Sequence, residues 1–261
     1  LFKIRKFALT PLRLSFVDAI SGEIVTSLDL GAPFVERFGY PYLVMHRSDL
    51  LSVLLEACRA ESRISLETGR DAVAIEDRET GARVICADGT VYDCAALIGA
   101  DGLWSPTRKF IADDGPPRAF PYVAYRGAIP IADVSEHAGL ENVIMWGGPD
   151  MHFVQYPIRR GELFNQVAVF KSPSWPAADW GNEAELDAHY AQCCAYVRKS
   201  LTKIHRDRRW EMIDRKPIAT WVRNRIALLG DAAHPMLQYI AQGACQAIED
   251  KICLADRVRE I

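Results

Sequence analysis

The chain has 261 residues, a hydrophobic fraction of 49%, a charged fraction of 25% and a formal net charge of -3 at pH 7. These values are typical of a folded globular protein, and they exclude a disordered chain and a polycationic nucleic-acid binder. The length allows one large domain or two ordinary ones. No stretch approaches the roughly 20 consecutive apolar residues of a membrane span, and no signal peptide opens the sequence, so we expect a cytoplasmic protein.

The cysteines indicate a reducing environment and no metal site. Their number is odd, and they lack the paired spacing of zinc ligands, so we expect free thiols. They are Cys58, Cys86, Cys94, Cys193, Cys194, Cys245 and Cys253. The first methionine is Met45, so we expect the sequence to be part of a longer protein.

The first 60 residues predict a hairpin and a helix. Two short runs of strand-forming residues, 12–17 and 24–30, flank a turn at Ser21-Gly22. Apolar residues then recur at helical spacing over 48–60, where Ser48 is the expected N-cap.

Short alternating runs follow over 72–100 and predict a small antiparallel sheet that leads into an inner strand ending at Gly99-Ala100. Residues 121–170 read mainly as further strands and predict a second, β-rich lobe. We then expect one helix over 183–203, a return to strand over 210–231, and a last helix from about Gln242.

Two segments of the sequence have the same pattern of residues. Residues 96–110 and 226–250 each contain an apolar run, a small residue, an aspartate and a turn. Ligands of open α/β sheets bind beyond the carboxyl ends of the strands, where Asp101 and Asp231 would meet a sugar hydroxyl. Taken singly, each aspartate is better explained as a turn or helix-cap residue. The small residues after Asp231 begin a helix, whose N-terminus carries about half a positive charge and stabilises an adjacent anion.

Together the two turns resemble the downstream flavin motifs of the single-component aromatic hydroxylases, the flavoprotein family typified by p-hydroxybenzoate hydroxylase. The resemblance implies that Asp101-Gly102, with Arg108 following, serves both FAD and the nicotinamide cofactor. It also implies that Asp231 of the Gly230-Asp231 turn binds the ribityl chain. The remaining implied cofactor residues are the helix start at Gln242, Gly243 and Ala244, beside the isoalloxazine, and Arg47 of the "HRSDL" segment.

The resemblance implies a mixed α/β fold with a Rossmann-like FAD-binding lobe, its N-terminal part missing, interleaved with a β-sheet substrate-binding lobe. The implied division is a substrate-lobe hairpin at 1–30, a partial FAD-binding lobe at 31–115, a β-rich substrate lobe at 116–222 and a final FAD-binding segment at 223–261. None of the 17 glycines forms the family's GxGxxG motif, which we expect to precede this sequence.

Within the family, the segments around 148–170 and 230–250 are most similar to 3-hydroxybenzoate 6-hydroxylase and salicylate hydroxylase-like members. The implied substrate residues are His152, Tyr156 and Gln238. His152 and Tyr156 are four residues apart in "HFVQY", so a strand would place them on one face, about 13 Å apart. His152 is the candidate base, and the alternative is a histidine that is hydrogen-bonded in the core. His234 and Tyr42 are further candidates for the pocket.

The expected activity is hydroxylation of a small monohydroxylated aromatic acid with FAD, O2 and NADH or NADPH, converting 3-hydroxybenzoate to 2,5-dihydroxybenzoate. Salicylate 1-hydroxylation and hydroxynicotinate hydroxylation remain open. A truncated flavoprotein lobe without turnover is an alternative of another class. A plain NAD(P)-linked dehydrogenase is disfavoured, because neither turn is a Rossmann fingerprint. If the protein self-associates, a homodimer is the commonest arrangement.

Overall fold

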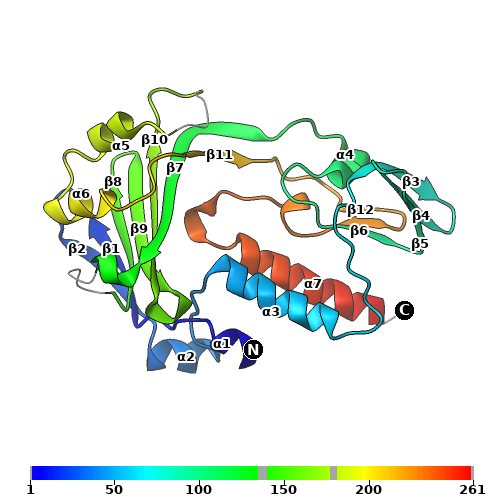
Figure 1. The fold of residues 1–261 in the computed structure, drawn as a ribbon, viewed down its shortest axis with the longest axis horizontal. Helices are drawn as coiled ribbons and strands as arrows, with labels where there is room; N and C mark the ends of the chain where they lie inside the picture. The colour runs from blue at the N-terminus through cyan, green and yellow to red at the C-terminus, as the bar shows by residue number, and fades with distance from the viewer. Residues whose placement is uncertain (1, 135–139, 177–180, 260–261) are drawn as a thin grey trace. The chain divides into compact units, whose positions relative to one another are not determined.

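The computed structural model describes residues 2–134, 140–176 and 181–259 of a mixed α/β chain (Figure 1). Contacts divide the chain into two compact units. Unit 1 comprises Leu1–Leu66 and Pro121–Glu211, and unit 2 comprises Glu67–Phe120 and Met212–Ile261. Each unit is thus assembled from two separate segments of the sequence. Within the described ranges, no helix is both long enough and apolar enough to cross a membrane.

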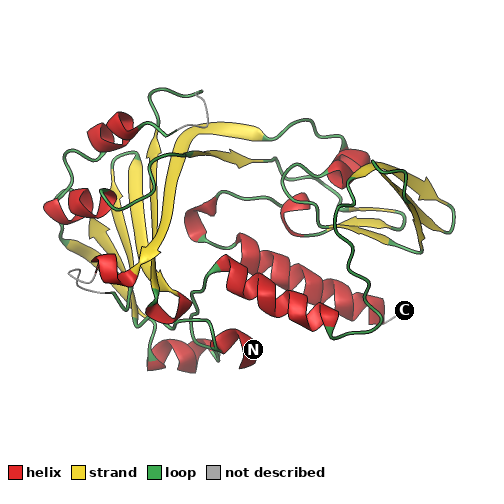
Figure 2. Ribbon diagram, viewed as in Figure 1, coloured by secondary structure: helices red, strands yellow, loops and turns green. Residues whose placement is uncertain are grey.

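A seven-stranded sheet in the order β11-β7-β10-β9-β8-β1-β2 lies mostly in unit 1, and its strands are drawn in yellow in Figure 2. Strands β1 and β8 are parallel, whereas β8, β9, β10 and β7 pair antiparallel in turn. The strands are β1 Arg13–Asp18, β2 Ile24–Asp29, β7 Arg118–Pro130, β8 Val143–Gly148, β9 Met151–Ile158, β10 Leu163–Lys171 and β11 Trp210–Asp214. The strands expected over residues 121–170 are therefore confirmed.

The predicted hairpin is also confirmed, because β1 and β2 pair antiparallel. Its turn is closed by Asp18, whose Oδ1 accepts hydrogen bonds from the backbone amides of Ile20 and Ser21 at 2.9 and 2.7 Å. Gly22 has φ +81°, a conformation that glycine adopts without steric cost.

One face of the large sheet packs against helices to form the main core. The fully buried side chains there include Tyr125, Phe153 and Phe170, with Leu186 and Val197 from the helices. The helices of unit 1 are α1 Phe2–Arg5, α2 Ala32–Phe38, α3 Arg47–Arg59, α5 Glu183–His189 and α6 Ala195–Leu201.

The single helix expected over 183–203 was wrong, since the chain forms α5 and α6 with a break between them. Tyr190 ends α5, and its buried hydroxyl lies 2.9 and 3.0 Å from the carbonyl oxygens of His152 and Val169. The amide of Cys194 then donates to the carbonyl of Ala19 at 2.8 Å. The Cys194 amide thus bonds to the hairpin instead of to a helical carbonyl, and both helices contribute buried side chains to the same core.

Helix α3 forms where it was expected, but Ser48 is not its N-cap. His46 caps the helix, because its Nδ1 accepts from the Ser48 amide at 3.2 Å, while the Ser48 hydroxyl lies 2.6 Å from the same nitrogen. The helical spacing located the element correctly, and the choice between neighbouring polar residues depended on the local backbone.

Among the described residues, unit 2 contains two three-stranded sheets and two α-helices. The first sheet, β3-β4-β5, is antiparallel as predicted. In the second, β12-β13-β6, strands β13 and β6 are parallel. The elements are β3 Ala72–Arg78, β4 Gly81–Cys86, β5 Val91–Cys94, β6 Leu97–Gly99, α4 Pro106–Ala112, β12 Val222–Arg223, β13 Ile226–Leu228 and α7 Gly243–Arg259.

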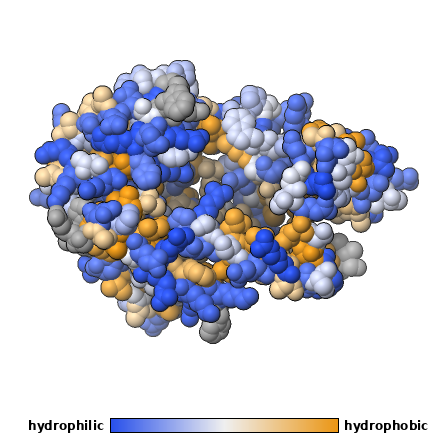
Figure 3. All heavy atoms as spheres, in the orientation of Figure 1, coloured by the Kyte–Doolittle hydropathy of each residue, from blue (hydrophilic) through white to orange (hydrophobic). Residues whose placement is uncertain are grey.

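The unit boundaries differ from the predicted divisions. Residues 31–66 belong to unit 1 together with the large sheet, whereas the sequence grouped 31–115 in one lobe. The other boundaries fall near 120 and 211. Hydrophilic side chains cover much of the viewed surface of both units (Figure 3), as the composition indicates.

Candidate functional site

The two aspartate turns lie at the same edge of one sheet in unit 2. Parallel strands β6 and β13 align Gly99 with Leu228, and the Leu229 amide donates to the Gly99 carbonyl at 2.9 Å. Asp101 and Asp231 follow these strand ends, so both turns lie beyond the carboxyl edge, where ligands of such sheets bind.

The Asp101 carboxylate organises its own turn. Oδ1 accepts from the Ser105 hydroxyl at 2.5 Å, and Oδ2 accepts from the hydroxyl and amide of Thr107 at 2.7 and 3.0 Å. Gly102 has φ +79° within the turn. This carboxylate therefore fixes the start of α4, which agrees with the turn-residue alternative, and its contact with a cofactor sugar remains a prediction.

Arg108 differs from what the family resemblance implied. Its side chain is fully buried, and it pairs with Asp114 at 2.7 Å. It also donates to the carbonyl oxygens of Ala233 at 2.7 Å, Ala232 at 3.2 Å and Lys216 at 2.6 Å. Its Nε also donates to Asp114 at 3.1 Å, so these bonds together use all five guanidinium donors. Arg108 thus connects α4 to the Gly-Asp turn through protein groups.

The hydrogen bond from Arg108 lowers the pKa of Asp114, against the opposing effect of desolvation. Arg215 adds a second cation at 3.2 Å from the same carboxylate. Asp114 therefore remains ionised and holds two buried arginines in place beneath the turns.

The Gly230-Asp231 turn packs closely on α7. Gly230 has φ +59°, its amide donates to Asp250 at 3.0 Å, and an added Cβ would lie 3.1 Å from Cβ of Ala247. Asp231 itself is exposed, and no hydrogen bond or ion pair joins its carboxylate to any residue in the described part of the chain. An added Cβ on Gly243 would lie 3.8 Å from Asp231 Oδ1, so this carboxylate lies close to the first residue of α7.

These features fit the flavin that the fold family implies. An exposed carboxylate without a protein partner suits the hydroxyls of a ribityl chain, and the glycines permit close approach of a ligand to the backbone. The first amides of a helix such as α7 have no intrahelical acceptor and favour an anionic neighbour. Gln242 immediately precedes this helix, and Gly243 and Ala244 form its first turn.

His234, which follows the same turn, is bound by other residues of the protein. Its Nε2 lies 2.5 Å from Asp250 Oδ2, and its ring centroid lies 5.1 Å from that of Trp221. The histidine therefore helps to attach the turn to α7, which disfavours its assignment as a substrate contact.

In unit 1, β9 divides its side chains between the two faces of the large sheet. Met151, Phe153 and Gln155 are buried on the helix-covered side, whereas His152 and Tyr156 are partly exposed on the opposite side, here named the open face. The prediction that His152 and Tyr156 share a face is confirmed.

Both residues have shifted ionisation on the open face. Desolvation lowers the pKa of His152, which favours the neutral imidazole. Desolvation also raises the pKa of Tyr156, with Tyr42 adding to the effect and Arg126 opposing it. A neutral histidine accepts a proton and a protonated phenol donates a hydrogen bond, so the open face carries one candidate base and one candidate donor.

The other predicted residues are placed as follows. Gln238 begins the 3-10 turn Gln238–Ile240 in unit 2, and Arg47 is the exposed first residue of α3 in unit 1. Gln238 and the pair on β9 belong to different units, so their joint action on a substrate stays a prediction. Tyr42 is within electrostatic reach of Tyr156.

Arg126 is a candidate that the sequence reasoning missed. It lies on β7, where Val123 and Tyr125 face the core and Arg126 points to the open face. The available signal was a lone basic residue in the otherwise apolar run "YVAYRGAIP".

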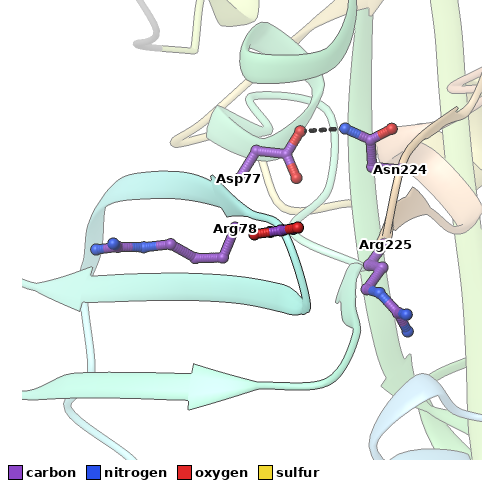
Figure 4. Close-up of a pocket in the computed structure, with 5 residues that line it drawn as sticks. Asp77, Arg78, Asn224 and Arg225 are labelled. Carbon is purple, nitrogen blue, oxygen red and sulfur yellow. Dashed lines mark hydrogen bonds between the residues drawn. The ribbon is translucent and has the colours of Figure 1, made fainter.

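A pocket of about 720 Å³ elsewhere in unit 2 does not belong to this arrangement. It is lined by Asp77, Arg78, Glu79, Asn224 and Arg225. Figure 4 shows Asn224 donating to Asp77, at 2.5 Å. Asn224 and Arg225 immediately precede β13 and the other three residues lie at the end of β3, whereas the aspartate turns follow the far ends of β13 and β6. In the part of the chain that the structure describes, no cluster of histidine, cysteine and acidic side chains could hold a metal ion, and all seven cysteines are free.

The chain matches a known family over nearly its whole length. Residues 20–260 match the model of the FAD binding domain family. The chain is 38% identical over 247 residues to 3-hydroxybenzoate 6-hydroxylase 1 of Aquipseudomonas alcaligenes, covering 93% of this chain and 62% of the relative. It is 30% identical to 6-hydroxynicotinate 3-monooxygenase of Bordetella bronchiseptica, covering 91% and 62%.

Solved structures agree with this match. Klebsiella pneumoniae HpxO complexed with FAD and uric acid has a TM-score of 0.83 and 28% identity, covering 95% of this chain and 63% of that one. A salicylate hydroxylase substrate complex has a TM-score of 0.79 and 26% identity, covering 94% and 64%. This sequence thus spans somewhat under two thirds of the relatives that it matches. The chain belongs to the FAD binding domain family and, within it, to the flavin-dependent aromatic hydroxylases.

Proposed function

We propose that this chain is part of a monooxygenase that binds FAD, consumes NADH or NADPH and O2, and hydroxylates a monohydroxylated aromatic acid. The observation that carries the proposal is the exposed, unpaired Asp231 carboxylate beside the start of α7. Three relatives at 34–38% identity are named 3-hydroxybenzoate 6-hydroxylase. Their similarity supports 3-hydroxybenzoate as the substrate and 2,5-dihydroxybenzoate as the product.

The cofactor, when bound, would supply the reduced flavin that activates oxygen. Asp231 would accept hydrogen bonds from its ribityl hydroxyls, and the first amides of α7 would stabilise negative charge on its ring. We assign Asp101 and Gly102 to shaping the neighbouring turn and Arg47 to the anionic part of the cofactor.

On the substrate side, His152 would take the phenolic proton and so make the ring more electron-rich for attack. The lowered pKa of His152 keeps the imidazole neutral near pH 7, as this role requires. Tyr156 would donate a hydrogen bond to a substrate oxygen, and Gln238 would contact the phenol oxygen. The ring of a small aromatic acid fits between residues spaced about 13 Å apart along one strand.

Salicylate 1-hydroxylation and hydroxynicotinate hydroxylation are the competing activities, and relatives with related names match this chain. A flavoprotein lobe without turnover is the competing class. The flavin turns do not discriminate among these activities, whereas the residues of the open face do.

The test begins with the absorbance spectrum of the purified chain and titration with FAD. NADH oxidation is then compared with 3-hydroxybenzoate and with salicylate. We expect FAD to bind and 3-hydroxybenzoate to stimulate oxidation. Asp231→Asn should weaken FAD binding, while the control Asp71→Asn, at another exposed carboxylate of unit 2, should not. Failure of the full-length protein that contains this chain to take up FAD would contradict the proposal.

A further inference from the structure

Two buried glutamines face each other on the helix-covered side of the large sheet. Gln155 of β9 and Gln166 of β10 are direct partners in the antiparallel pairing, and both side chains are fully buried. The Cβ atoms of residues paired in this way are about 4.5–5.5 Å apart, so the two amides occupy one small region of the interior. Glutamine is seldom fully buried, because its amide needs hydrogen-bond partners there.

This glutamine pair lies between two hydrophobic clusters on the same side of the sheet. Two residues away in one direction, Phe153 pairs with Ala168, and both belong to the main core of unit 1. Two residues away in the other direction lies Phe164, which packs in a smaller cluster with Ile129. Apolar side chains at the two glutamine positions would join the clusters, so the amides interrupt an otherwise apolar interior.

Hydrogen bonds within the protein satisfy only part of the pair. Gln155 Oε1 accepts from Trp146 Nε1 at 3.0 Å. Gln155 Nε2 and both polar atoms of the Gln166 amide are buried and have no hydrogen-bond partner among the described residues, so neither amide bonds to the other. A buried polar atom loses its hydrogen bonds to solvent, and native proteins supply nearly all such atoms with a partner, either a protein group or an ordered water.

We propose that the Gln155–Gln166 pair is a binding site for ordered internal water. A water molecule there accepts from the Nε2 donors and donates to Gln166 Oε1, which gives it the two to four polar partners that a buried water needs. The indole that bonds to Gln155 is held in turn by α6, since the ring centroids of Trp146 and Tyr196 lie 4.9 Å apart. Because both glutamines are fully buried, the bound water exchanges slowly with the solvent.

The first test is a crystal structure of the full-length protein that contains this chain. We expect an ordered water within about 3.2 Å of Gln155 Nε2 and of an amide atom of Gln166. This measurement needs no substitution, so it decides the question even if a variant fails to fold.

The second test measures long-lived waters in solution by magnetic relaxation dispersion of the water oxygen. Gln166→Met removes the unpartnered amide, keeps a similar side-chain length and leaves the bond between Trp146 and Gln155 in place. This variant should lose the dispersion amplitude of at least one water. Gln192→Met, at an exposed glutamine of unit 1, is the matched control and should keep the full amplitude.

Two results would overturn the proposal. One is a crystal structure in which the two amides bond to each other or to another protein group, with no water between them. The other is an unchanged dispersion amplitude in Gln166→Met. Either result leaves the proposed function untouched, because the water site involves neither the cofactor nor the substrate.

Discussion

The Arg108 guanidinium shows how a residue can support a binding site from within the protein. Its five donors are taken by Asp114 and by three carbonyl oxygens, two of them in the turn that follows Asp231. Replacing it leaves these buried acceptors without partners, and such losses are costly because desolvation of each group is no longer offset.

We therefore expect Arg108→Met to lower the free energy of unfolding by about 3–5 kcal/mol. FAD affinity should fall as well, since the turn carrying Asp231 loses its attachment to α4. Urea unfolding followed by circular dichroism provides the measurement, and Lys109→Met, at the exposed next residue of α4, is the control. A loss below about 1 kcal/mol would show that Arg108 does not brace the turns.

The lowered pKa of His152 predicts a dependence of stability on pH. As the pH falls through about 6.5, the unfolded chain takes up a proton that His152 in the folded chain still resists. Stability should therefore decrease between pH 7.5 and 5.5, and His152→Gln should flatten this decrease. His189 contributes in the same direction, because desolvation lowers its pKa too, so part of the dependence should remain in the variant. Thermal unfolding at both pH values tests this, and an identical slope in the variant would refute it.

At the level of elements, strand β6 and helix α4 pack closely because Gly99, the last residue of β6, has no side chain. A Cβ added to Gly99 would lie 2.5 Å from Cβ of Thr107, one of the residues held by Asp101. The turn between strand and helix is therefore compact because residue 99 is glycine.

Gly99→Ala should destabilise the chain by about 1–3 kcal/mol, the usual range for overpacking. Gly147→Ala is the matched control, since an added Cβ there meets nothing within 4 Å and the residue also lies in a strand. Chemical unfolding of both variants gives the comparison. Equal stabilities for the two would mean that α4 moves away from β6 without cost.

The order of elements along the chain was largely predictable, because local periodicity reflects which face of each element is buried. The hairpin, the small antiparallel sheet and the strands of 121–170 formed where expected. The break between α5 and α6 was not predictable, since it depends on Tyr190 bonding to carbonyls of two strands that are distant in sequence. The N-cap of α3 was predicted wrongly for a related reason. His46 and Ser48 are both polar, and the local backbone conformation decides which of them caps the helix.

Across the whole molecule, each unit has a hydrophobic cluster of its own. The main cluster, with Phe153 and Phe170, lies within unit 1, and a second cluster, with Leu228, Ala232 and Ala233, lies within unit 2. Regions with separate hydrophobic cores unfold locally, each with its own free energy of unfolding.

We expect Phe153→Ala to cost about 3–5 kcal/mol and to raise amide hydrogen exchange in β8, β9 and β10. Exchange in β6 and β13 should change little. Leu228→Ala provides the reciprocal control, with faster exchange in β6 and β13 and little change in β9. Mass spectrometry of exchanged peptides gives the readout, and uniform acceleration throughout the chain in either variant would contradict separate cores.

The sequence by itself determined the two Asp-containing turns and the pair His152 and Tyr156 on one strand face, because these depend on local spacing and on which residues alternate. The fold class followed from the resemblance of these turns to a known family. Tertiary structure alone decided three further points. It aligned β6 with β13 and so brought the turns to one edge, it enclosed Arg108 among protein acceptors, and it placed Arg126 on the same open face as His152 and Tyr156. The physical reason is that strand register and the partners of a charged side chain are set by contacts between residues far apart in the chain, which local patterns do not encode.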